Sequence, residues 1–283
     1  MFKLTVDPDQ IREARWPLIV GVTAASIALT TLAVYAVLGT DLLTPLHEAT
    51  DGWLHPTFLI NVVLMALLVV GLMFLAGRLR PRDVGLTTSS LRVGVLVTLG
   101  LWGASQLIGL VVNLILTGSI QLDTLWHERG TGFIFGSLIA QVFGNALQEE
   151  IVYRGFLLNQ LVLKLRRLVK RPGVAIAAAL LVSQAVFALM HIPVRLLYGF
   201  TAAELPAILL MPLLLGLFFS LVYHRTGNLF IAVGVHTLNN IPLALFTSQN
   251  LATGVILVLS LLLLVIWPRL SGQPAGQRAL TAA

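Results

Sequence analysis

The sequence predicts an all-α polytopic membrane protein with about eight transmembrane helices. Of its 283 residues, 57% are hydrophobic and only 11% are charged, whereas soluble domains carry roughly 25% charged residues. The apolar residues also lie in long runs, and a run of about 20 residues crosses a hydrocarbon core of ~30 Å as a helix. A helix is expected because backbone groups in lipid must be paired within their own segment.

Eight such runs are separated by Pro, Gly or charged residues, which mark the loops. The first run is longer than the core of a signal peptide and lacks a convincing cleavage site, so we interpret it as a retained span. The expected spans are residues 17–39, 54–77, 92–117, 132–154, 173–191, 205–223, 228–246 and 250–267.

Polar motifs, described below, divide the chain into five parts. Two of the parts are terminal segments, two contain spans without motifs, and one carries the motifs. They are a cytoplasmic N-terminal segment (1–16), three spans without motifs (17–131), the motif-bearing core (132–246), a last span (247–267) and a disordered cytoplasmic tail (268–283).

The basic residues set the expected orientation. With the N-terminus inside, fifteen Lys and Arg residues fall in cytoplasmic segments, and only Arg129 and Arg195 fall outside. Arg154 lies near a span and is not counted in either group. An excess of basic residues in short cytoplasmic loops is the usual topology signal. We therefore expect a multi-pass protein of the cell membrane with both termini in the cytoplasm.

The net charge of +6 does not indicate a nucleic-acid partner, because the basic residues are spread over short loops between spans. The expected surroundings are the lipid bilayer. The chain contains no cysteine, which excludes disulfides, thiolate metal sites and a cysteine nucleophile.

Glu149 and Glu150 are the only two of the twelve acidic residues that fall inside a predicted span. Burying a carboxylate near the membrane centre costs about 3 kcal/mol or more. Glu150 and Arg154 are four residues apart and can form an ion pair on one helix face. Successive residues of a helix are turned by about 100°, so the side chain of Glu149 points away from this ion pair. Its carboxylate is left free for general-base chemistry. The alternative is an interfacial charged cluster that only ends the span.

Two other predicted spans carry histidines with a partner one helical turn away. Phe187 precedes His191 at the end of one span, and His236 precedes Asn240 within another. A histidine at the end of a span is often a satisfied interfacial residue, but His236 lies well inside an apolar run. Together these groups could activate a water and stabilise an oxyanion, as amide hydrolysis requires. Two histidines and a carboxylate could also bind zinc.

These three motifs, in this order on separate apolar helices, resemble the CPBP family of intramembrane proteases. That family includes the type II CAAX prenyl endopeptidases and the bacteriocin-processing or immunity proteins. The resemblance covers residues 141–240 and has no mismatch at a motif position. It implies an intramembrane protease whose active site is enclosed by the helix bundle, and a membrane-bound protein or peptide as its substrate.

The resemblance also implies a role for each matched residue. Glu149 would be the general base that acts with His191 on the attacking water. His236 and Asn240 would stabilise the oxyanion. The supporting residues would be Glu150 and Arg154, as the ion pair that orients Glu149, and Phe187, which would pack beside His191.

The cofactor stays open at this point. The family is often labelled as metalloproteases, and Glu149, His191 and His236 would then hold the metal, as zinc. A metal-free glutamate mechanism suits the same residues equally well, and the sequence lacks the His-Glu-x-x-His zinc motif.

Two other functions compete with proteolysis. A non-catalytic membrane scaffold or bacteriocin-immunity protein could keep the same fold, although this chain keeps every motif residue. A transporter would place polar groups along a path across the membrane, whereas the first three spans hold few of them.

One geometric condition must hold for this site to form. In straight helices, His191 and His236 would differ in depth by about 15 Å at 1.5 Å per residue. The motifs can therefore meet only if helices are tilted, short or broken, and we expect breaks near Pro193 and at Asn239–Pro242.

Overall fold

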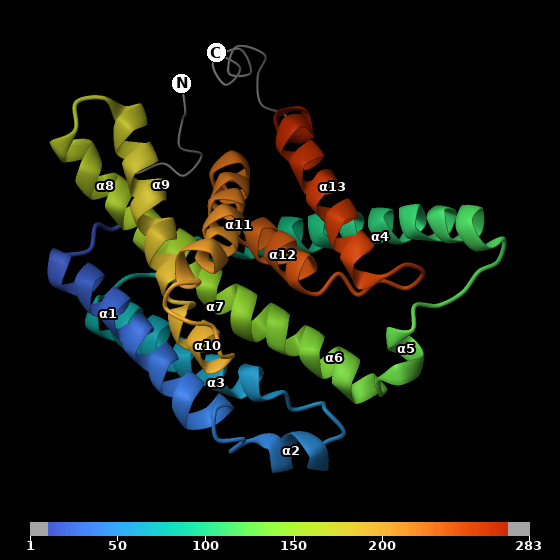
Figure 1. Ribbon diagram of the computed structural model, residues 1–283. Helices are drawn as coiled ribbons and strands as arrows, with labels where there is room; N and C mark the ends of the chain where they lie inside the picture. Colours follow the sequence, from blue (N-terminus) through green and yellow to red (C-terminus); the bar gives the residue numbers. More distant parts are fainter. Residues whose placement is uncertain (1–10, 271–283) are drawn as a thin grey trace.

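The computed structural model describes residues 11–270. Over this range the chain forms helices and connecting segments, with no strand, which confirms the predicted all-α fold (Figure 1). The tail expected to be disordered lies, from residue 271 onward, outside the described residues, as do residues 1–10 of the predicted N-terminal segment.

Four of the helical elements are π-helical (η2, η3, η5 and η6), one is a 3-10 turn (η4), and the others are α-helices. In chain order they are α1 (Trp16–Ala33), η2 (Val34–Leu38), α2 (Thr44–Ala49), α3 (Pro56–Leu64), η3 (Met65–Ala76), η4 (Pro81–Val84), α4 (Thr88–Thr117), α5 (Leu125–Glu128), α6 (Thr131–Ile139), η5 (Ala140–Ala146), α7 (Leu147–Glu149), η6 (Glu150–Leu158), α8 (Asn159–Leu168), α9 (Pro172–Leu189), α10 (Ile192–Leu197), α11 (Leu205–Thr226), α12 (Leu229–Asn240) and α13 (Gln249–Leu270).

Within the described part of the chain, six helices are long and apolar enough to cross a membrane, so the expected count of eight is not confirmed. These six coincide with six of the predicted spans, and the chain is a multi-pass membrane protein. They are Trp16–Leu38, Pro56–Ala76, Pro81–Thr117, Pro172–Leu197, Leu205–Thr226 and Gln249–Leu270.

The predicted span 132–154 is part of a longer helical rod, residues 131–168, which we call the central helix. It runs without interruption from α6 through η5, α7 and η6 to α8, and it crosses the middle of the bundle diagonally in Figure 1. Its residues 148–162 are all buried. Neighbouring helices therefore cover this stretch, and its glutamates are shielded from lipid.

The predicted span 228–246 is shorter than expected. Its helix α12 has 12 residues, or about 18 Å at 1.5 Å per residue, and it ends at Asn240, just before Pro242. Every residue of α12 except Phe230 and Asn240 is buried. Its closest approach is to α4, where Gly234 faces Thr98 so tightly that an added Cβ would collide with the threonine hydroxyl.

The N-terminal residues that precede α1 are fastened to the end of the central helix. Glu13 forms ion pairs with Lys164, at 2.6 Å, and with Arg167. The side-chain amide of Gln160 accepts a hydrogen bond from the backbone N–H of Ala14 and donates one to the carbonyl of Arg12. Several segments predicted to be cytoplasmic therefore meet at one end of the bundle.

Candidate active site

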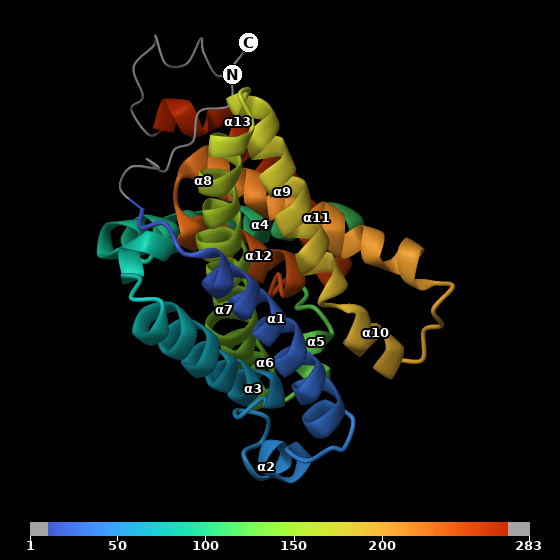
Figure 2. The same ribbon diagram turned by 90° about the vertical axis from the view of Figure 1, so that its left-hand side faces the viewer.

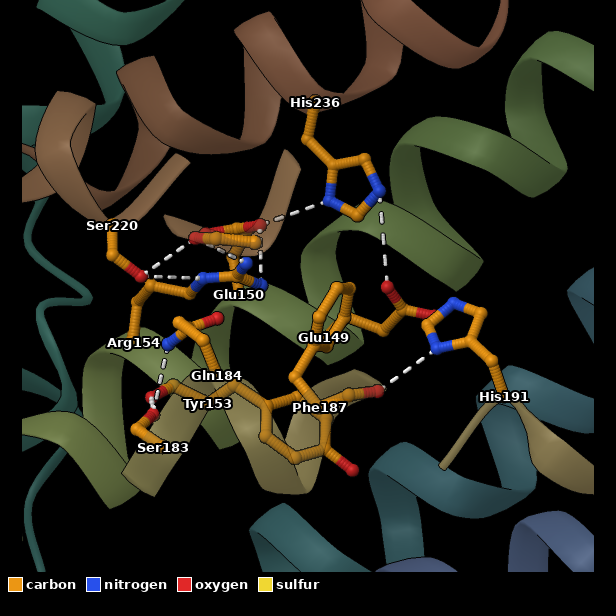
Figure 3. Close-up of polar contacts among 11 residues, drawn as sticks. Glu149, Glu150, Tyr153, Arg154, Ser183, Gln184, Phe187, His191, Ser220 and His236 are labelled. Carbon is orange, nitrogen blue, oxygen red and sulfur yellow. Dashed lines mark hydrogen bonds and ion pairs between the residues drawn. The ribbon is translucent and has the colours of Figure 1, made fainter. Parts of the chain in front are cut away.

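The middle of the central helix carries a fully buried ion pair. Glu150 Oε1 lies 3.0 Å from a terminal nitrogen of Arg154, and both side chains have no exposed surface. The sequence spacing of four residues predicted this pair, and the structure confirms the contact (Figure 3). The backbone changes from α-helix to π-helix at Glu150, and such π-helical insertions are frequent at functional sites.

Two further helices complete the surroundings of Arg154. From α11, the carbonyl of Gly216 accepts a hydrogen bond from Nη2 at 3.0 Å, and the hydroxyl of Ser220 accepts one from Nε at 3.3 Å. From α9, the ring of Phe187 lies 4.3 Å below the guanidinium carbon. A Cβ at Gly216 would stand 2.8 Å from Phe187 and 3.2 Å from Arg154. This position therefore needs glycine for the helices to approach.

His236 enters the cluster from α12 and contacts both glutamates. Its Nδ1 lies 2.9 Å from Glu150 Oε1, and its Nε2 lies 3.7 Å from Glu149 Oε2. Because Glu150 also pairs with Arg154, it is a carboxylate, so Nδ1–H of His236 is the donor. The helical spacing predicted different directions for the two glutamates, yet they reach opposite nitrogens of one imidazole (Figure 3).

His191 approaches from the end of α9. Its Nδ1 lies 2.9 Å from the carbonyl oxygen of Phe187, and because a carbonyl only accepts, Nδ1 carries the proton. In a neutral ring the lone pair is then on Nε2. The Phe187 ring stands edge-on to both imidazoles, with centroids 4.9 Å from His191 and 6.5 Å from His236. Figure 3 shows the Glu149 carboxylate pointing toward His236, with the His191 ring overlapping it in this view.

The convergence of the histidines depends on the two helix breaks that the sequence indicated. Helix α9 ends at Leu189, and His191 is the N-cap of the short helix α10. Helix α12 ends at Asn240. Neither histidine therefore sits at the depth that a straight, full-length span would give it, and the predicted mismatch of depth does not arise.

Asn240 is the one motif residue that the structure does not join to the cluster. It is the last residue of α12, its side chain is exposed, and that side chain has no hydrogen bond to another described residue. It lies one helical turn after His236, so both project from the same side of the helix.

A second group of polar residues, which no sequence motif indicated, lies next to the cluster. The Tyr153 hydroxyl lies 3.0 Å from the hydroxyl of Ser26 on α1 and donates to the sulfur of Met190. Ser183 donates to the carbonyl of Tyr153, and Gln184 donates to Ser183. Polar residues inside a span are costly, and this signal alone could have identified Ser183 and Gln184.

Glu149 differs from Glu150 in how its carboxylate is held. Each has a buried Oε2 atom that accepts no hydrogen bond from any described residue. Oε1 of Glu150, however, is held by Arg154 and His236, whereas Glu149, with a side chain that is 7% exposed, only faces Nε2 of His236 at 3.7 Å. A buried carboxylate oxygen without a donor is rare in folded proteins. An oxygen in this state can accept a proton from a bound molecule, and Nε2 of His236 lies 3.7 Å from it.

The residues do not form a complete metal site in this geometry. Among the described residues, no three His, Asp or Glu side chains are grouped closely enough to hold a metal ion. Glu149 and His236 approach each other, but His191 does not close the set that the resemblance implied.

Comparison with known proteins finds one matching family model, which covers part of the chain. Residues 130–242 match the family model described as type II CAAX prenyl endopeptidase Rce1-like. The match includes all seven motif residues, from Glu149 to Asn240, and it confirms the resemblance drawn from the motifs. The matched family is a family of proteases. No curated protein and no solved structure matches the chain.

Proposed function

We propose that this chain, which matches the Rce1-like family model over residues 130–242, is an intramembrane endopeptidase that hydrolyses a peptide bond with a glutamate-activated water. One observation carries the proposal. Glu149 Oε2 is buried, receives no hydrogen bond from the described residues, and faces an imidazole at 3.7 Å. A positioned carboxylate of this kind is suited to act as a general base.

In the proposed reaction, Glu149 takes a proton from the water as its oxygen attacks the carbonyl carbon of the scissile bond. His191 offers the lone pair of Nε2 to the second hydrogen of the water, since its Nδ1 is occupied by the Phe187 carbonyl. The proton held by Glu149 then passes to the leaving nitrogen as the C–N bond breaks, and the carboxylate is regenerated. No covalent intermediate with the enzyme is needed.

His236 would stabilise the oxyanion through Nε2–H, and this role requires a doubly protonated ring because Nδ1–H already donates to Glu150. Such a ring would stand between the side chains of Glu149 and Glu150, with one nitrogen toward each. A fixed donor in a water-excluded site stabilises the developing charge strongly. Asn240, one turn away, would supply a second donor.

The Glu150–Arg154 pair would position the reacting groups. Glu150 holds both Arg154 and Nδ1 of His236, and it is adjacent in sequence to Glu149. A buried pair costs desolvation energy, and this cost is understandable if the pair fixes the orientation of His236 and the backbone that carries the base.

The substrate would be a membrane-associated protein or peptide, of the CAAX type in line with the family. We place both termini in the cytoplasm from the distribution of basic residues. This orientation requires the two segments to lie on the same side of the membrane. In support of it, Glu13 pairs with Lys164 and Arg167 at one end of the bundle. A pair of quenched peptides that differ only in a prenyl group would show whether the lipid is recognised.

The decisive experiment compares Glu149→Gln with Glu204→Gln in purified protein. Glu204 is exposed before α11, so it is a matched control for loss of a carboxylate. Glu149→Gln should lower cleavage by a factor of ~10² or more, the usual contribution of a general base, while Glu204→Gln should cleave normally. Full activity in Glu149→Gln would refute the hydrolase assignment.

The same preparations test the metal. Bound zinc and cleavage should be measured together in wild type, His191→Ala and His236→Ala. We expect cleavage to fall in both variants without a stoichiometric metal being lost. One zinc per chain in wild type that disappears in both variants would contradict the metal-free mechanism.

A further inference from the structure

Helix α11 contributes an aromatic side chain to the site that has no part in the mechanism above. Phe219 is 1% exposed, and its ring stacks on the imidazole of His236 with centroids 4.4 Å apart and planes 19° from parallel. The guanidinium carbon of Arg154 lies 5.6 Å from the same ring. Phe219 therefore lies beside two of the partners of Glu150.

We propose that Phe219 is a positioning residue, which fixes the plane of the His236 ring so that Nδ1 meets Glu150 while Nε2 faces Glu149. The proposal rests on the proposed function for its catalytic consequence. Its structural part, the fixed ring, can be tested without activity.

The hydrogen bond to Glu150 cannot orient the imidazole alone. It fixes one nitrogen, but the ring can still rotate about that contact, and the second side-chain torsion of histidine has a broad energy minimum. A flat ring packed face to face at 4.4 Å opposes this rotation, because tilting the imidazole would push its edge into Phe219. The Phe187 ring, which stands at 84° to the imidazole, limits movement in the other direction.

Stacking also fits the charge that the mechanism needs on His236. A cation over the face of an aromatic ring is attracted by the ring's quadrupole, so the stacked Phe219 ring would accommodate a positive charge on His236 during the reaction. An aliphatic side chain of similar volume would fill the space but would supply neither the flat face nor this attraction. His191, by comparison, has only an edge contact with Phe187, at 73°.

The experiment compares Phe219→Leu with Phe218→Leu. Phe218 is the next residue, is half-buried, and packs against the same core, but among the described residues its only ring contact is with Phe219. Phe219→Leu should lower kcat about tenfold, as expected for a misoriented catalytic group, and leave KM unchanged. Phe218→Leu should leave both constants unchanged.

A spectroscopic measurement separates positioning from packing. In protein labelled with ¹⁵N-histidine, the ring signals of His236, assigned with His236→Ala, should shift or broaden in Phe219→Leu and stay in place in Phe218→Leu. Phe219→Tyr keeps a flat ring, so it should restore the His236 signals and most of kcat.

Two results would overturn the proposal. Unchanged His236 signals in Phe219→Leu would show that the ring is not held by Phe219. Equal losses of kcat in Phe218→Leu and Phe219→Leu, without recovery in Phe219→Tyr, would show that Phe219 contributes only to core packing. Full activity in Glu149→Gln would instead refute the proposed function, and the His236 signals would still decide whether Phe219 fixes the ring.

Discussion

The N-terminal spans and the motif-bearing core both consist of apolar helices, but they differ in where their apolar and charged side chains lie. Helix α4 turns large apolar side chains such as Leu96 and Ile115 outward, as a lipid-facing helix does. The core places Glu150, Arg154 and His236 almost completely out of solvent and surrounds them with one another (Figure 2 shows the central helix between its neighbours). The first region is built by hydropathy, whereas the second depends on exact pairing of buried charges.

This difference predicts where single substitutions are most harmful. Arg154→Ala should be the most destabilising, by about 3–5 kcal/mol, because it leaves Glu150 as a buried and unpaired carboxylate. Arg167→Ala removes an arginine that is 72% exposed and pairs with Glu13, and it should cost about 0–1 kcal/mol.

Unfolding in detergent, followed by circular dichroism, measures both variants. Equal stabilities would mean that the buried pair contributes no more than a surface pair, and the comparison between the two regions would fail.

Gly216→Ala tests the packing of the core without changing a charge. The new methyl group would press on Phe187 and Arg154, and overpacking of this kind costs about 1–3 kcal/mol. The matched control is Gly254→Ala in α13, where no atom lies within 4 Å of the added carbon. That variant should be as stable as wild type or slightly more so, since alanine favours a helix. A Gly254→Ala variant that loses as much stability would show that the effect is not specific to the site.

The sequence predicted six of the spans that the structure describes, as well as the buried glutamates and the histidines, because each of these follows from hydropathy or from spacing along one helix. Contacts between helices were not predictable in this way. Gly216 and Phe219 meet Arg154 and His236 across more than 15 residues of intervening chain and a change of helix, and no local pattern distinguishes Phe219 from Phe218. The change to π-helix at Glu150, which brings both glutamates to one imidazole, also has no local sequence signal.

Ser26→Ala tests whether the N-terminal spans stabilise the helix that carries the site. The Ser26 hydroxyl on α1 is fully buried beside the hydroxyl of Tyr153 in the central helix, so its removal should cost about 0.5–1.5 kcal/mol, the net value of a hydrogen bond. Thr31→Val is the control, because Thr31 bonds only to the carbonyl of Ile27 in its own helix. If both variants match wild type in unfolding, α1 serves only as a lipid-facing cover.

The smallest effect is expected outside the membrane, where Glu13 joins the N-terminal residues to the central helix. Its hydrogen bond and ion pair with Lys164, together with the charge of Arg167, hold the pKa of this carboxyl below its ordinary value. A depressed folded-state pKa contributes stability above the unfolded-state pKa, and that stability is lost as the pH falls through the folded-state pKa. Glu13→Gln should therefore cost about 0.2–1 kcal/mol at neutral pH and should match wild type in acid. The difference should also shrink in high salt, which screens exposed pairs. If the stability difference between Glu13→Gln and wild type persisted in acid and in high salt, Glu13 would act by packing and not by its charge. The end of the central helix would then depend on close packing, as its buried middle does.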